Sequence, residues 1–82
     1  MSIQSPHDDS VHLLDARELE PPEPMVQVLE LLETLAPGHR ICLLLRREPH
    51  PLYAILGRNG YAWKTRMTPE YEFETLIWRV MD

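Results

Sequence analysis

The sequence contains a single cysteine, Cys42, among its 82 residues. One thiol can form neither an internal disulfide nor a cysteine-rich zinc site, which favours a reducing cytoplasm as the location of the protein. No apolar run approaches the roughly 20 residues that span a bilayer, so we expect no membrane contact. The segment MSIQSPHDDS, residues 1–10, lacks the basic and apolar stretches of a signal peptide, and we expect a flexible tail there.

Basic residues are few and unevenly placed. The chain has 8 Lys and Arg against 13 Asp and Glu, a formal net charge of −5, which argues against nonspecific nucleic-acid binding because an acidic surface is repelled by phosphates. Residues 1–39 hold eight acids and one arginine, whereas residues 40–66 hold six bases and one acid. The middle third is therefore locally positive, either as a solvated face or as a site for an anion or an acidic partner.

Catalytic signatures are also missing. The sequence has no glycine-rich nucleotide loop, no Ser-His-Asp set and no paired-carboxylate pattern. It does have eight prolines, three of them in the segment DARELEPPEP (residues 15–24), directly before an apolar run. Pro22 suits the first turn of a helix, where its missing N–H would have no intrahelical partner.

Apolar periodicity and turn residues predict six elements. After the proline segment, apolar residues recur at spacings of three and four up to Ala36, and Pro37-Gly38 ends the helix. In the middle of the segment HRICLLLRR, both the odd and the even positions are apolar, which indicates a central strand with some burial on both faces. The predicted elements are a strand at 11–16, a helix at 22–36, a strand at 39–47, a helix at 50–58 and strands at 61–67 and 71–80.

This order, β-α-β-α-β-β, predicts the fold class: an α/β two-layer sandwich with a mixed four-stranded sheet and two helices on one face. We expect the tail at 1–10 to precede a single domain at 11–82. The last two strands form a hairpin rich in aromatic residues, so the uncovered face of the sheet should carry some of them. An exposed sheet face or edge favours a protein partner or a homodimer.

The chain resembles the TusA/SirA-like superfamily of small bacterial proteins at Asp15-Ala16-Arg17, at Leu19, at Pro22-Glu23-Pro24, which opens a helix, and at Pro37-Gly38, which closes it. That superfamily has a CPxP signature at the start of its first helix and a β-α-β-α-β-β fold. The resemblance covers about residues 12–80. The later segments REPHPLYAIL and NGYAWKTR look closer to an uncharacterised branch of the superfamily.

The signature cysteine of the sulfur carriers is replaced here by Pro21. A thiol at a helix N-terminus has a lowered pKa and can carry sulfur as a persulfide, whereas proline has no nucleophile. We therefore expect sulfur transfer by the family's route to be absent. Cys42 is the alternative nucleophile, but its place in the middle of a strand favours an inert apolar filler.

Candidate binding residues lie at the two predicted helix starts. Arg46 and Arg47 precede the second helix, and guanidinium groups pair with carboxylate or phosphate, so a small anionic ligand is one interpretation. The other interpretation is that these arginines are solvated or ion-paired. Pro49 and Pro51 favour this second interpretation, because they remove N–H donors that an anion would need. The candidate binding residues are Arg17, Pro21, Pro22, Glu23, Pro24, Arg46, Arg47 and His50.

Two other groups of polar residues predict structural roles. His7, Asp8, Asp9 and His12 are of the types that ligate metals, but their spacing fits no strong metal motif, so we expect surface residues and no metal or other cofactor. Arg17 and Glu23 flank the first helix start, and Asp15 lies nearby at a strand end, so we expect these residues to form a structural network that fixes the loop.

As a whole, the sequence predicts a non-enzymatic small binding or interaction module with a TusA/SirA-like fold that has lost the sulfur-carrying cysteine. The alternative is a ligand- or metal-binding accessory protein in bacterial redox or sulfur metabolism. An active sulfur carrier that uses Cys42 ranks last.

Overall fold

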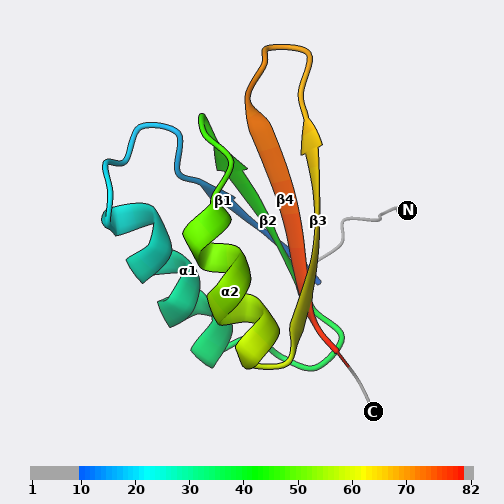
Figure 1. The fold of residues 1–82 in the computed structure, drawn as a ribbon. Coiled ribbons are helices and arrows are strands. Elements are labelled where there is room, and N and C mark those ends of the chain that lie inside the picture. Colours follow the sequence, from blue (N-terminus) through cyan, green and yellow to red (C-terminus); the bar gives the residue numbers. More distant parts are fainter. Residues whose placement is uncertain (1–9, 81–82) are drawn as a thin grey trace, which may run out of the picture.

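The computed structural model describes residues 10–80, and its elements follow the predicted order (Figure 1). Four strands form one mixed sheet in the order β1-β2-β4-β3, in which β1 and β2 are parallel and the other neighbouring pairs are antiparallel. The elements are β1 (Val11–Asp15), α1 (Glu23–Glu33), β2 (Arg40–Leu45), α2 (His50–Arg58), β3 (Tyr61–Met67) and β4 (Phe73–Arg79). The predicted fold class is confirmed, while the expected tail lies almost wholly outside the described residues.

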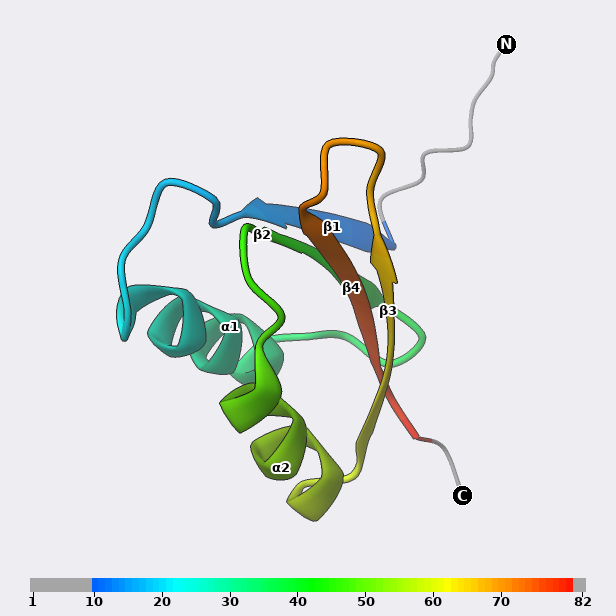
Figure 2. The same cartoon turned by 45° about the horizontal axis from the view of Figure 1, so that its top comes forward.

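Both helices cover the same face of the sheet, as Figures 1 and 2 show from two directions. α1 forms the crossover that two adjacent parallel strands require, and α2 leads into the β3–β4 hairpin. The other face has no described element over it, and we call it the open face. Within residues 10–80, no helix has the length and apolar character needed to cross a membrane.

The core lies between the helices and the covered face of the sheet. In β2, Ile41, Leu43 and Leu45 are buried, whereas the alternate residues Cys42 and Leu44 are only half-buried because they point to the open face. The prediction of a central strand is confirmed, but only one of its faces is fully buried. The buried apolar residues are Ala16, Val28, Leu32, Leu35, Ile41, Leu43, Leu45, Leu52, Leu56 and Ile77.

Several element boundaries differ from the prediction by one to three residues, and two of these differences have clear local reasons. α1 ends at Glu33 rather than Ala36, because the N–H and the hydroxyl of Thr34 both bond to the Leu31 carbonyl and tighten the last turn. β4 starts at Phe73 rather than residue 71, because residues 68–72 form the hairpin turn with Tyr71 at a φ of 63°.

The aromatic residues of the hairpin mostly face the helices. Tyr61 and Trp63 pack against the core, and Trp63 stacks on Tyr53 of α2 with ring centroids 5.1 Å apart. Phe73 shares the inward parity of the buried residues of β4, so Trp78 is the one hairpin-strand aromatic on the open face. The open face therefore carries one of the aromatic residues expected there, Trp78, and its other apolar residues are aliphatic or Cys42.

Candidate functional site

A cavity of about 620 Å³ lies where the loop after β1 meets the segment between β2 and α2. The two segments meet because β1 and β2 are parallel, so their carboxyl ends share one edge of the sheet. Five of the eight prolines line the cavity, which we call the proline pocket. Its lining residues are Ala16, Arg17, Leu19, Glu20, Pro21, Pro22, Pro24, Met25, Leu43, Leu45, Arg46, Arg47, Glu48, Pro49, Pro51 and Leu52.

The walls of the proline pocket are apolar. Leu43, Leu45 and Leu52 are buried and form its floor, while Leu19 and Met25 are half-buried at its sides. Groups of this kind favour the apolar part of a ligand, because burying apolar surface is favourable at roughly 25 cal/mol per Å².

The start of α1 offers few backbone donors. Pro22 caps the helix, the N–H of Glu23 bonds to the Glu20 carbonyl at 2.8 Å, and Pro24 has no N–H. A helix start normally binds anions through its free N–H groups. The prolines therefore begin the helix in a geometry that suits it while leaving little capacity to hold an anion.

α2 begins in the same way. Pro49 is its cap and Pro51 is its second residue. The N–H of His50 bonds to the Glu48 carbonyl and that of Leu52 to the Pro49 carbonyl, both at 3.0 Å. The two helix starts beside the pocket thus share a Pro-x-Pro sequence and the same shortage of amide donors, as the prolines predicted.

Arg17 is held by two carboxylates. Its guanidinium donates to both oxygens of Asp15, at 2.8 and 2.7 Å, and to Glu72 at 3.0 Å. The bonds from the Arg17 side chain and backbone lower the pKa of Asp15 to about 2, and the two carboxylates raise that of Arg17. The Asp15–Arg17 part of the expected network is present and reaches the hairpin through Glu72, whereas, within residues 10–80, Glu23 takes no part in it.

The other two arginines differ from each other. Arg46 donates to Glu18 at 2.6 Å and lies 3.8 Å from Glu72. Arg47 is exposed and makes no ion pair with any residue in the range 10–80. Of the three lining arginines, Arg47 is therefore the one with a guanidinium available to a ligand.

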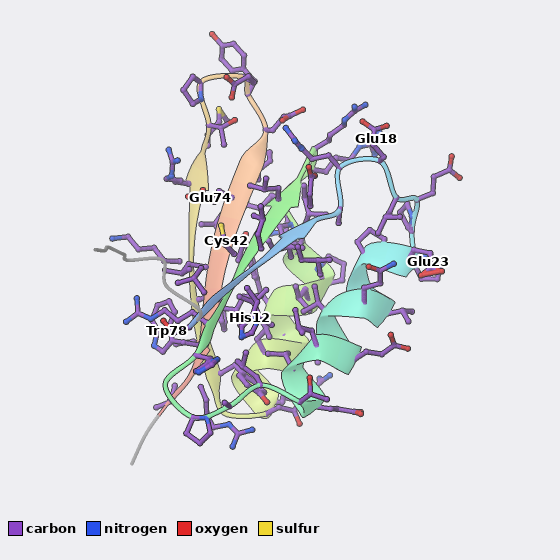
Figure 3. All side chains as sticks on the ribbon, turned by 180° about the vertical axis from the view of Figure 1, so that it is seen from behind. His12, Glu18, Glu23, Cys42, Glu74 and Trp78 are labelled. Atoms are coloured by element: carbon purple, nitrogen blue, oxygen red, sulfur yellow. The ribbon has the colours of Figure 1, made fainter. Side chains whose placement is uncertain are left out.

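Two of the predicted site residues lie outside the pocket lining. Glu23 is exposed on the first turn of α1 and borders a shallower depression on that helix (Figure 3). His50 is exposed and lies 3.5 Å from Glu48. The structure thus brings together Arg17, Pro21, Pro22, Pro24, Arg46 and Arg47, and leaves Glu23 and His50 beside them.

A chain of hydroxyl groups behind the pocket was not predicted. Tyr53 donates to Glu48 at 2.9 Å and contacts the Thr65 hydroxyl at 2.7 Å, which contacts that of Thr75 at 2.9 Å. Thr75 is fully buried. The available sequence signal was a threonine at the inward parity of each hairpin strand, in positions that the register places opposite each other.

The residue types of a metal site are not brought together in the described range. His7, Asp8 and Asp9 lie outside it, and the Nε2 atom of His12 lies 2.9 Å from Nδ1 of His39. Residues 10–80 contain no group of three or more His, Cys, Asp or Glu side chains that could hold a metal ion.

Cys42 lies on the open face, on the other side of the sheet from the proline pocket (Figure 3). Partial burial and the nearby Glu74 carboxylate raise the pKa of its thiol. The side chain is half-buried rather than enclosed in the core. This environment does not favour the thiolate form.

These features define a small α/β protein with an apolar pocket at the carboxyl ends of two parallel strands. The chain belongs to the family described as "Uncharacterized conserved protein (DUF2249)", which matches residues 13–79 and so includes all six described elements except the first two residues of β1. Neither the curated proteins nor the solved structures contain a match.

Proposed function

We propose that this protein is a non-enzymatic binding module whose recognition site is the proline pocket. The observation that carries the proposal is the pocket itself: an apolar floor enclosed by two proline-bounded helix starts, with one unpaired guanidinium at its rim. Pockets with apolar walls and a few placed polar groups are the usual form of a ligand site.

The chemistry of the lining supports binding rather than catalysis. Among the described residues that line the pocket, none is Ser, Thr, Cys, Tyr, His or Lys. Arginine is always protonated and serves poorly as a base or nucleophile. The carboxylates Glu20 and Glu48 remain, and Glu48 already accepts a hydrogen bond from Tyr53.

The pocket also supports the proposed relation to the TusA/SirA-like sulfur carriers. Pro21 lies two residues before the first residue of α1, is exposed and lines the pocket. In those carriers the corresponding position is the cysteine of the CPxP signature. We propose that the chain retains their fold and helix start and has lost the sulfur-carrying atom.

The second candidate is a ligand-binding accessory protein in bacterial redox or sulfur metabolism, and the concave, mainly apolar shape of the pocket supports it as well. A small anionic ligand would pair with Arg47, because Arg17 and Arg46 already bind carboxylates. Most of its contacts would still be apolar, so we propose a ligand or side chain that is mainly apolar, with at most one anionic group.

The test uses 8-anilinonaphthalene-1-sulfonate, a probe with an apolar body and one anionic group. We expect blue-shifted fluorescence on binding, with methyl NMR shifts centred on Leu43, Leu45 and Leu52. Met25→Trp fills the pocket and should weaken binding at least tenfold, about 1.4 kcal/mol. Arg47→Gln removes one exposed charge partner and should weaken it about two- to fivefold.

The matched control is Val26→Trp, which adds the same side chain at the next position of α1, outside the pocket lining. It should leave the affinity unchanged. Methyl shifts centred on Leu13 and Leu76 would instead place the probe on the open face and refute the pocket as the recognition site.

A further inference from the structure

The open face has a regular pattern that the strand register defines. Each of three rows crosses the sheet in the order β1, β2, β4, β3, with one outward-pointing residue from each strand. The rows are Asp15, Leu44, Glu74, Arg66; then Leu13, Cys42, Leu76, Lys64; then Val11, Arg40, Trp78, Ala62.

This face has the composition of an interface. Seven of its twelve residues are apolar, counting Cys42, and Val11 and Leu13 are 44 % and 66 % exposed. Its charged residues are three bases and two acids, although the protein carries a net charge of −5. The open face is therefore a surface on which two copies of this acidic protein repel each other little.

The charges have opposite signs at the two edges of the sheet. β1 carries Asp15, whose side chain is 44 % exposed, whereas β3 carries Lys64 and Arg66. A surface with an acidic edge and a basic edge complements a copy of itself that is rotated so that the edges exchange.

We propose that the open face binds a second copy of this chain, through a two-fold axis that runs parallel to the strands between β2 and β4. This rotation lays β1 over β3 of the second copy and keeps each row opposite the same row. Asp15 then faces the second copy's Arg66, and Val11 faces its Ala62.

The inner strands match in two of the three rows. In the remaining row Leu44 faces Glu74 of the second copy, whose carboxylate keeps its bond to Arg66 of its own chain. Cys42 faces Leu76 of the second copy, which is an apolar contact. Arg40 already lies 5.5 Å from the Trp78 ring of its own chain, and it meets the equivalent indole of the second copy. Aligned packing of two sheets at about −30° is a common geometry for such faces.

The other in-plane two-fold axis, perpendicular to the strands, is less favourable. It lays each strand over its own copy and reverses the rows, so that Lys64 faces Lys64 of the second copy. Asp15 would then face Val11 of the second copy and Arg66 would face its Ala62, so neither charge would gain a partner across the interface. The charge pattern therefore selects the parallel axis.

The existing ion pairs are compatible with this dimer. Asp15 keeps its bonds to Arg17, and Arg66 keeps its 2.7 Å bond to Glu74. A carboxylate has about four acceptor sites and a guanidinium five donors, so each group can add a partner across the interface.

The first test is the mass in solution, by sedimentation equilibrium from about 1 μM to about 1 mM, the range that modest interfaces occupy. We expect a concentration-dependent dimer. Leu13→Lys should raise the dissociation constant at least ~100-fold, because it places a second cation opposite Lys64 of the second copy. Val26→Lys, at a 42 % exposed valine of α1, is the matched control and should leave it unchanged.

The second test fixes the axis by disulfide cross-linking in a Cys42→Ser background. Val11→Cys and Ala62→Cys, combined in one chain, should give a covalent dimer under mild oxidation, whereas each alone should not. The two positions lie three strand spacings apart in one sheet, about 14 Å, which is too far for an intrachain disulfide.

Any of three results would overturn the proposal. A monomer mass at every concentration would exclude the dimer. A dimer that Leu13→Lys leaves intact, or one in which the combined cysteines fail to cross-link, would place the interface elsewhere or on the other axis.

Discussion

The hydroxyl groups of Tyr53, Thr65 and Thr75 form a hydrogen-bonded chain that ends at Glu48 of the proline pocket. From this chain we predict that a second substitution restores part of the stability that a first one removes. The Glu48 carboxylate accepts a hydrogen bond from the Tyr53 hydroxyl, so Tyr53 must accept one from Thr65, and Thr65 one from Thr75. Burial and the Glu48 carboxylate raise the pKa of Tyr53, which keeps it a donor. The direction of every bond in the chain is therefore fixed by its carboxylate end.

Thr65→Val breaks this chain in the middle. The Thr75 hydroxyl, which is 0 % exposed, loses its acceptor, and an unsatisfied buried donor costs about 1–3 kcal/mol. Thr75→Val removes the donor itself and should cost less, about 0.5–1 kcal/mol. The double variant should then be more stable than Thr65→Val alone, because the orphaned hydroxyl is gone.

Equilibrium urea unfolding measures this order, and the thermal midpoint checks it. For a domain of this size 1 kcal/mol corresponds to about 4–8 °C, so Thr65→Val should lower the midpoint by roughly 10 °C. Additive losses in the double variant, or a cost for Thr65→Val below about 0.5 kcal/mol, would refute the reasoning. The Thr75 hydroxyl would then have another acceptor, such as Tyr53.

Three further predictions concern local features of the chain. Because Arg17 lowers the pKa of Asp15 to about 2, the stability that this pair contributes should be present above about pH 4 and lost as the pH falls toward 2; Asp15→Asn should remove that part of the pH dependence in acid unfolding curves. Pro21→Cys, in a background without the native thiol, should give a thiol with a pKa below the ordinary 8.5, because it lies near the positive end of α1; iodoacetamide rates against pH measure it, and an unshifted value would contradict the role of the helix start. Gly57→Ala should stabilise α2 by about 0.5–1 kcal/mol in urea unfolding, since its Cβ would meet only Trp63 at 3.8 Å, whereas Gly60→Ala should destabilise the protein because its φ is +82°.

The order of elements was predictable because local signals agreed with the final packing. Pro22 and Pro49 cap the two helices, and Gly38 and Gly60 supply the positive φ angles before β2 and β3. These residues act through backbone geometry within a few positions of themselves. Such signals can be read from the sequence without knowledge of the tertiary contacts.

The candidate site was predictable in part. The sequence pointed to both helix starts, but it gave no indication that they share one pocket. That depends on β1 and β2 being adjacent and parallel. The partner of Arg17 lies 55 residues away at Glu72, and no local pattern joins two residues at that separation.

The sequence did not show which face of the sheet most of the aromatic residues occupy, and the reason is different. Alternation along β3 showed that Tyr61 and Trp63 share a face, but alternation alone does not say which face the helices cover. In the structure Trp63 stacks on Tyr53 of α2, so Tyr61 and Trp63 lie on the face that the helices cover. The open face therefore receives the residues of the opposite parity, including Lys64 and Arg66, which give it the charge pattern of a self-complementary surface.

The pocket and the open face lie on opposite sides of the sheet, and β4 with its preceding turn serves both. Glu72 holds Arg17 and Arg46 beside the pocket, whereas Glu74, two residues on, bonds to Arg66 on the open face. Two copies joined through their open faces would have both helical layers, and so both pockets, directed outward. Neither site would then block the other, and a dimer would present two binding sites at a fixed separation, so a ligand or partner with two matching groups would gain avidity without any new contact.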